Sequence, residues 1–117
     1  MARKTDIFFN AETVWKTPTE IVRYRDFDFV DDIPASDSIR AMGGASSTTI
    51  KAFDTSGADV TSTIIGFQTV SGTKLHAELK NGTDGQDFVI VATAEMTTSV
   101  EKIEKFLKLK VRAIPKV

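Results

Sequence analysis

A chain of 117 residues, with 41% hydrophobic and 26% charged residues, is long enough to bury one core and has the composition of an ordinary globular domain. Its formal net charge of −1 provides no strong overall field to attract nucleic acid. The absence of cysteine excludes disulfides, thiolate metal sites and cysteine nucleophiles. No stretch is apolar for long enough to predict a signal peptide or a membrane span, so we expect no membrane contact.

The first 19 residues differ from the rest of the chain because they lack a clear periodicity. Phe8 and Phe9 end a run of three apolar residues, and Trp15 follows among polar ones. Two interpretations stay open: a lead-in whose Trp15 caps one end of the core, or an arm that docks on a neighbouring subunit. We therefore predict an N-terminal extension or arm over 1–19 and one domain over 20–117. The candidate partner contacts are Phe8, Phe9 and Trp15.

The pattern of segment 20–30 predicts a strand whose alternation changes phase. Val22 and Tyr24 share one face, whereas Phe27 and Phe29 fall on the other. Such a change predicts a bulge, or a strand that passes from one sheet to another. The Asp-Asp-Ile-Pro sequence that follows is expected to end the strand at a corner, because proline lacks an N–H.

Three short strands are predicted in the middle of the chain, at 37–42, 48–53 and 60–67, because these runs combine apolar and β-branched residues. Gly-Gly follows the first of them. An Asp-Thr-Ser-Gly turn lies between the other two, where Asp54 can accept a hydrogen bond from the backbone two residues on and Gly57 supplies positive φ.

The clearest pattern lies in residues 74–99. Apolar and polar residues alternate over 74–80 and again over 87–96, and the turn sequence Asn-Gly-Thr-Asp-Gly lies between them. This arrangement predicts a β-hairpin in a sheet with one wet face. Val89 and Val91 add apolar side chains to the other face of the second run, so we expect a central strand that is covered in part on both sides.

The last segment, 100–113, fits two structures. Its apolar residues recur at helical spacing, and Thr98 with Glu101 could form a capping box. Ile103, Leu107 and other apolar residues also share one face of a strand. We favour a strand, because a single helix among at least six strands would need a sheet face of its own. Short strands at a spacing of about ten residues then indicate a β-sandwich.

A basic row lies on one face of this last predicted strand and consists of Lys108, Lys110 and Arg112. Nucleic-acid contact is one interpretation of such a row. Protection of an edge strand against aggregation is the better one, because lysines are common on exposed sheet edges. We therefore expect no nucleic-acid partner.

Residues with reactive side chains are few and dispersed. His76 lies on the polar face of an alternating run, where a solvated role is expected rather than catalysis or metal binding. The aspartates match no calcium-loop spacing, and turn chemistry explains them. No nucleophile elbow, P-loop or dinucleotide fingerprint is present. We therefore predict no enzyme activity, no catalytic or metal-binding residue and no cofactor.

Four stretches resemble a group of small bacteriophage virion proteins: SDSIRAM, FDTSGADVT, LKNGTDGQDFVIVATAEMTTS and EKFLKLKV, which lie within 20–113. In that group a D-S-I strand precedes a D-x-x-G-x-D-V-T turn, a glycine-rich hairpin and a closing strand of alternating Leu and Val. This chain has Asn81 where the hairpin turn of the group begins with glycine, and asparagine also enters the left-handed region. The resemblance implies an immunoglobulin-like antiparallel β-sandwich of about seven strands, with an N-terminal extension.

The resemblance also implies a function. The expected role is a non-enzymatic structural component of a phage or prophage particle, in the head–tail region, the tail or a capsid accessory position. Its partners would be other virion proteins, with self-association as a second option, and it would move from the bacterial cytoplasm to the virion on assembly. The alternative is a carbohydrate-binding or adhesion-type sandwich, for which one Trp and one Tyr make a thin aromatic platform.

Overall fold

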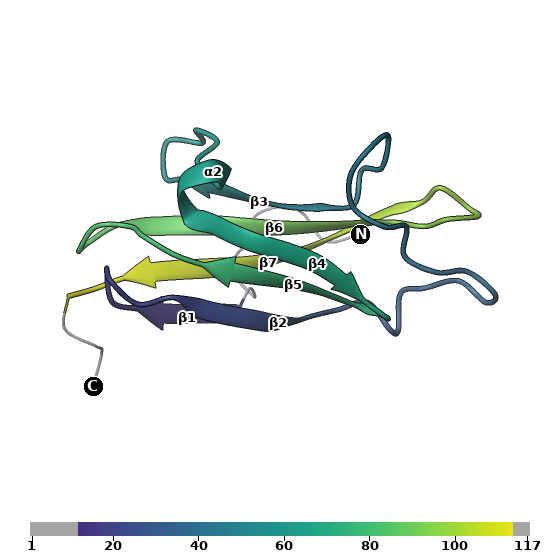
Figure 1. Ribbon diagram of the computed structural model, residues 1–117, viewed down its shortest axis with the longest axis horizontal. Coiled ribbons are helices and arrows are strands. Elements are labelled where there is room, and N and C mark those ends of the chain that lie inside the picture. The colour runs from purple at the N-terminus through teal and green to yellow at the C-terminus, as the bar shows by residue number, and fades with distance from the viewer. Residues whose placement is uncertain (1–11, 114–117) are drawn as a thin grey trace.

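The computed structural model describes residues 12–113, apart from the side chains at positions 25 and 26. Within this range, seven strands form two sheets, and one short helix lies between β3 and β4 in the chain (Figure 1). The elements are β1 (Glu12–Lys16), β2 (Val22–Asp28), β3 (Thr49–Asp54), α2 (Thr61–Ile64), β4 (Ile65–Ser71), β5 (Lys74–Leu79), β6 (Asp87–Glu95) and β7 (Lys102–Val111). The four-stranded sheet has the order β1-β7-β6-β3, and the three-stranded sheet has the order β2-β5-β4.

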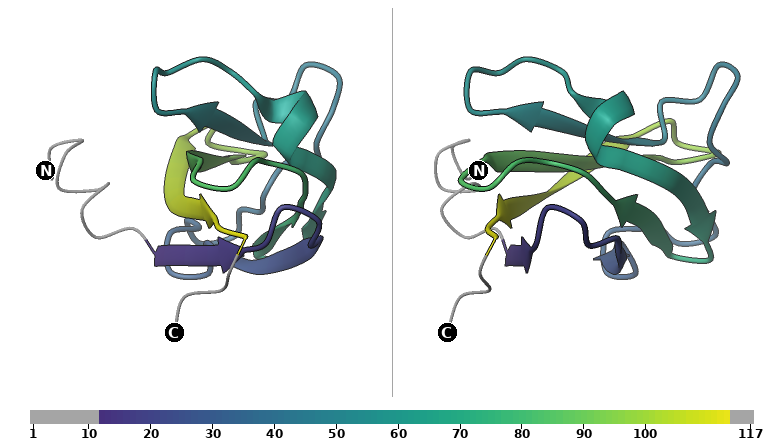
Figure 2. Two further views of the ribbon diagram at one scale, coloured as in Figure 1. Left: turned by 90° about the vertical axis from the view of Figure 1, so that its left-hand side faces the viewer. Right: turned by 60° about the vertical axis from the view of Figure 1, so that its left-hand side comes forward.

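The two sheets lie face to face and bury one core between them (Figure 2). From the three-stranded sheet, β5 buries Leu75 and Leu79. From the four-stranded sheet, β6 and β7 bury the alternate side chains that include Ile90 and Leu107. The predicted all-β class and the two-layered, sandwich-like arrangement are therefore confirmed. The facing sides of the two sheets are largely apolar, and removing them from water drives the sheets together.

The predicted hairpin over 74–99 is wrong in its pairing, although both of its strands form. β5 pairs with β2 and β4, whereas β6 pairs with β3 and β7. Residues 80–86 therefore carry the chain from one sheet to the other, and Asn81 adopts the expected left-handed conformation, with φ 58°. The alternation identifies the buried face of each strand but not its partner strand. The central position of β6 is confirmed.

The change of phase in β2 is a bulge. The register of β2 against β5 shifts between Tyr24 and Phe27, so that side chains on both sides of the shift contact the core. Phe27 is fully buried, and its ring meets that of Tyr24 edge to face, with 4.7 Å between the centroids. The strand stays within one sheet, so the alternative of a change of sheet is wrong.

The last segment is a strand, as predicted, and the helical alternative is wrong. β7 lies between β1 and β6, with β1 parallel to it and β6 antiparallel. The interpretation of its basic row as protection of an edge strand is therefore wrong, because β7 is an internal strand. The row faces outward on the four-stranded sheet, where Lys108 stands opposite Val89 and Lys110 stands opposite Trp15.

Two predicted strands in the middle of the chain are only partly formed. Segment 37–42 contributes a single bridge, between Ile39 and Met96. The run 60–67 begins with α2, and β4 starts only at Ile65. In the second case the Asp59 carboxylate accepts hydrogen bonds from the backbone and hydroxyl of Thr61, at 2.9 and 2.5 Å. Such local hydrogen bonds offer the backbone an alternative to the hydrogen bonds of a β-sheet.

Part of the predicted N-terminal extension belongs to the sheet, because Glu12–Lys16 pairs with β7 as strand β1. Trp15 does not cap the core. It faces outward and is 37% exposed, while its neighbours Val14 and Lys16 point inward. Phe8 and Phe9 lie outside the described residues.

Candidate interaction surfaces

An apolar groove of about 540 Å³ lies on the outer face of the four-stranded sheet. Phe53 stands opposite Val89 and Phe106 stands opposite Val91, so the groove crosses three adjacent strands. These four side chains are half-buried, and none of them belongs to the core. We call this feature the outer groove; its lining residues are Phe53, Asp54, Thr55, Gly57, Val89, Val91 and Phe106.

A charged cluster surrounds Trp15 on the same sheet. Lys110 Nζ and Arg112 Cζ each lie 5.7 Å from the centroid of the Trp15 ring, within the range of a cation–π contact. The Asp87 carboxylate accepts hydrogen bonds from Arg112 Nη2 at 2.9 Å and from Lys110 Nζ at 3.4 Å. Burial opposes the ionisation of Asp87, but the two cations outweigh it and lower the pKa of Asp87. Two cations share one carboxylate, so the cluster presents positive charge beside an indole.

The outer face of the three-stranded sheet also presents an apolar side chain, that of Phe67, which is 69% exposed. A pocket of about 250 Å³ lies beside it, lined by Arg23, Phe67, Thr69, His76, Ala77 and Glu78. His76 occupies the outward face of β5, as predicted. Sequence reasoning missed Phe67, because the register of β4 shifts between Ile65 and Gln68 and this bulge changes which residues face outward.

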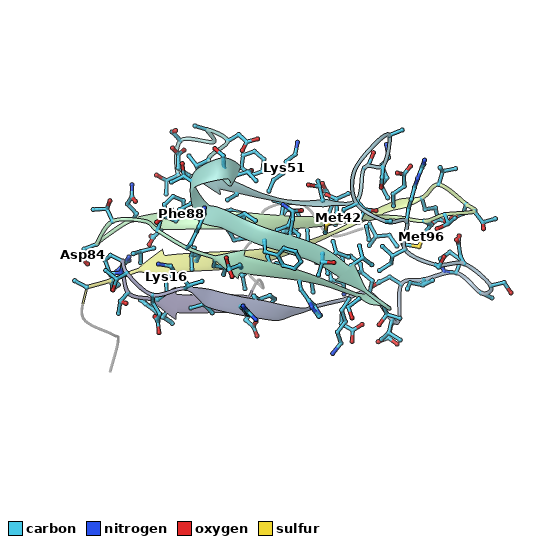
Figure 3. All side chains as sticks on the ribbon, viewed as in Figure 1. Lys16, Met42, Lys51, Asp84, Phe88 and Met96 are labelled. Carbon is cyan, nitrogen blue, oxygen red and sulfur yellow. The ribbon has the colours of Figure 1, made fainter. Side chains whose placement is uncertain are left out.

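Two buried charged side chains, Lys16 and Glu95, hold loops. Lys16 Nζ donates to the carbonyls of Thr17 and Asn81, both at 2.6 Å, which ties β1 to the crossover at 80–86. Lys16 and Asp84 lie at the same end of the molecule (Figure 3). Burial lowers the pKa of Lys16, and the charge of Glu20 offsets this in part. Glu95 accepts a hydrogen bond from the Ser47 backbone at 2.7 Å. Each of these hydrogen bonds holds a loop to a strand.

Asp37 joins two loops that are distant in the sequence. Its carboxylate accepts hydrogen bonds from the backbone N–H groups of Thr98 and Ser99, at 2.9 and 3.0 Å, and from that of Ser38 at 2.8 Å. These bonds, with that from Thr98 the strongest, lower the pKa of Asp37 to about 2. The carboxylate therefore anchors the turn between β6 and β7.

We expect Asp37→Asn to lower the midpoint of urea unfolding near neutral pH, because an amide oxygen replaces a carboxylate that accepts three N–H bonds. The pKa of Asp37 is about 2 in the folded protein, against an ordinary value of 3.8. The stabilisation is thus complete above the ordinary value and is lost as the pH falls toward the folded value. Urea unfolding of both proteins at several pH values should show their difference shrinking across this interval. A constant difference would contradict the anchoring role.

The same turn contains Val100 with φ 56°, in the left-handed region that β-branched residues avoid. Val100 is 57% exposed, so its side chain contributes little packing. We expect Val100→Asn to raise the free energy of unfolding by about 1 kcal/mol, because asparagine adopts this conformation more readily. Urea unfolding measures the change. Val30→Asn is the control: Val30 is 55% exposed and does not have positive φ. Equal effects of the two substitutions would refute the backbone explanation.

The described residues contain no group of three or more His, Cys, Asp or Glu side chains that could hold a metal ion. Between residues 12 and 113, no helix is long and apolar enough to cross a membrane. Comparison with protein-family models, with curated proteins and with solved structures found no match to the chain.

Proposed function

We propose that the protein is a non-enzymatic structural component of a phage or prophage particle, built on an immunoglobulin-like sandwich and acting through protein–protein contacts. The observation that carries this proposal is the apolar surface on both outer sheet faces. The outer groove lies on one face, and Phe67 projects from the other. Apolar side chains gathered on a surface and rimmed by polar residues are typical of protein interaction sites.

The order of the strands supports the immunoglobulin-like topology. If the strands are lettered A to G along the chain, the sheets read B-E-D and A-G-F-C. Constant-type immunoglobulin domains have the sheets A-B-E-D and C-F-G. The two arrangements differ only in the partner of strand A, which is strand G here and strand B in those domains. Residues 80–86 then correspond to the connection from E to F, which crosses between the sheets in such domains.

Two of the stretches that resemble virion proteins contain an aspartate that anchors a loop, which supports the assignment to a shared scaffold. Asp37 in SDSIRAM holds the turn between β6 and β7. Asp54 in FDTSGADVT accepts hydrogen bonds from the backbone of Ser56 and Ala58, at 2.9 and 3.0 Å. These residues shape loops of the scaffold. Trp15, which lies in the charged cluster, remains a candidate partner contact, as do Phe8 and Phe9.

The experiment is mass spectrometry of particles purified on a density gradient from the bacterium that encodes the chain. We expect the protein to follow the capsid and tail proteins through the gradient at a fixed ratio, and an abundant cytosolic enzyme serves as the control for contamination. Particles that contain capsid and tail proteins but not this chain would overturn the proposal.

The alternative is a carbohydrate-binding or adhesion-type module, which needs an aromatic platform for a sugar ring. Trp15 and Phe67 lie on the outer faces of different sheets, so together they do not form one platform. A glycan array with the wild-type protein and Trp15→Ala tests this alternative. Reproducible glycan binding that is lost in Trp15→Ala would replace the particle proposal.

A further inference from the structure

Phe67 is the most exposed of the large apolar side chains in the described part of the chain. It projects from the outer face of the three-stranded sheet, next to Glu78 and Arg23. The carboxylate of Glu78 lies 3.8 Å from Arg23 Nε, and the Arg23 side chain is 70% exposed. One surface of the molecule therefore presents a phenyl ring with a carboxylate and a guanidinium beside it.

The outer groove has complementary properties. Its apolar floor consists of the half-buried Phe53, Val89, Val91 and Phe106, and its volume of about 540 Å³ exceeds what one phenyl ring fills. Charged groups of both signs lie around it: Asp54 is among its lining residues, and Lys51 and Lys108 lie next to its valines. Lys51 stands opposite Val91, and Lys108 stands opposite Val89. A partner that inserts an aromatic ring could thus place Glu78 near a lysine and Arg23 near Asp54.

We infer that copies of this chain associate head to tail, with Phe67 of one copy bound in the outer groove of the next. The two surfaces lie on opposite outer faces of the sandwich, so one molecule can use both at once. Such an interface is heterologous, and it generates rings or open stacks rather than closed pairs. Burial of a phenyl ring in an apolar site provides the main stabilisation, and the opposite charges provide orientation.

Sedimentation velocity of two variants, each measured alone and then mixed, tests this geometry. Phe67→Ser removes the ring and keeps the groove, whereas Val91→Lys blocks the groove and keeps the ring. We expect the wild-type protein to form larger species as its concentration rises and each variant alone to remain monomeric. An equimolar mixture should form dimers and nothing larger, because only one productive contact is left. Circular dichroism confirms that both variants fold.

Cysteine trapping provides a second readout, because the chain contains no cysteine of its own. Under mild oxidation, a variant with both Thr69→Cys, beside Phe67, and Thr55→Cys, at the edge of the outer groove, keeps the ring and the apolar floor and should give a ladder of disulfide-linked multimers. Either substitution alone should give dimers at most. The matched control pairs Thr69→Cys with Thr98→Cys, in the exposed turn between β6 and β7, and should give no ladder above that expected from random collision.

A wild-type protein that stays monomeric, with no ladder from the double-cysteine variant, would overturn the inference. Association that stops at dimers would also overturn it, because that result indicates a self-complementary pair. The outcome is separate from the particle proposal. A chain that does not associate with itself can still bind other virion proteins, and a chain that stacks can still be missing from purified particles.

Discussion

Gly82→Ala is expected to lower the free energy of unfolding by about 3 kcal/mol, through strain in the backbone and a clash in the core. Gly82 lies in the crossover at 80–86 and has φ 93°. A Cβ at this position would lie 2.8 Å from Val111 Cγ2, closer than van der Waals contact allows. Val111 is fully buried on β7 and has little room to move. Urea unfolding of the variant measures the loss.

Gly85→Ala is the matched control for this prediction. Gly85 lies in the same crossover with φ 90°, but a Cβ added there would have no atom within 4 Å beyond its chain neighbours. Its substitution introduces the backbone strain alone, which we expect to lower the free energy of unfolding by about 1–2 kcal/mol. The difference between the two variants therefore isolates the clash with Val111. Equal losses would show that the side chain of Val111 plays no part.

Gln68→Met is expected to lower the free energy of unfolding by about 3 kcal/mol, because it leaves two backbone groups without partners. Gln68 Oε1 accepts a hydrogen bond from the Ile50 N–H at 2.8 Å, and Gln68 Nε2 donates to the Ile50 carbonyl at 3.1 Å. Ile50 belongs to β3, an edge strand of the four-stranded sheet. The Gln68 amide thus takes the place of a neighbouring strand, and methionine fills similar space without its polar groups.

Gln68→Glu separates the two hydrogen bonds. The introduced carboxylate can still accept from the Ile50 N–H, but it cannot donate to the Ile50 carbonyl and repels it. We expect the variant to be less stable than the wild type near neutral pH. It should recover in part as the pH falls below about 4, where a protonated carboxyl can donate. Urea unfolding of the three proteins at both pH values checks this. A Gln68→Met variant as stable as the wild type would refute the capping role.

Most of the strands were predictable from the sequence, because a period of two identifies a strand with one buried face. That rule located β5, β6 and β7, and the broken phase between Tyr24 and Phe27 located the bulge in β2. It could not identify the partner of β5 or β6, because a hairpin and a crossover between sheets show the same alternation. Helical residues at Thr61–Ile64 were missed because local hydrogen bonds of Asp59 outweighed the β propensity of the run.

The candidate surfaces were harder to predict. Trp15 was recognised as a candidate, but its place on the outer face of the four-stranded sheet depends on the pairing of β1 with β7, which no local pattern reveals. A signal for the outer groove was present in Val89 and Val91, whose apolar character indicated cover on the second face of β6. Phe53 and Phe106 come from other strands, and only the register brings them beside these valines. Phe67 required the bulge in β4.

The parallel pairing of β1 with β7 has a consequence for the time course of folding. Glu12 stands beside Leu107, so the first described strand finds its neighbour only when nearly the whole domain has been synthesised. Contacts between such distant positions slow folding, because a long loop must close before they form. A nascent chain on the ribosome therefore cannot complete the four-stranded sheet until β7 has emerged. Until then, the flank of β1 that later pairs with β7 stays accessible to chaperones.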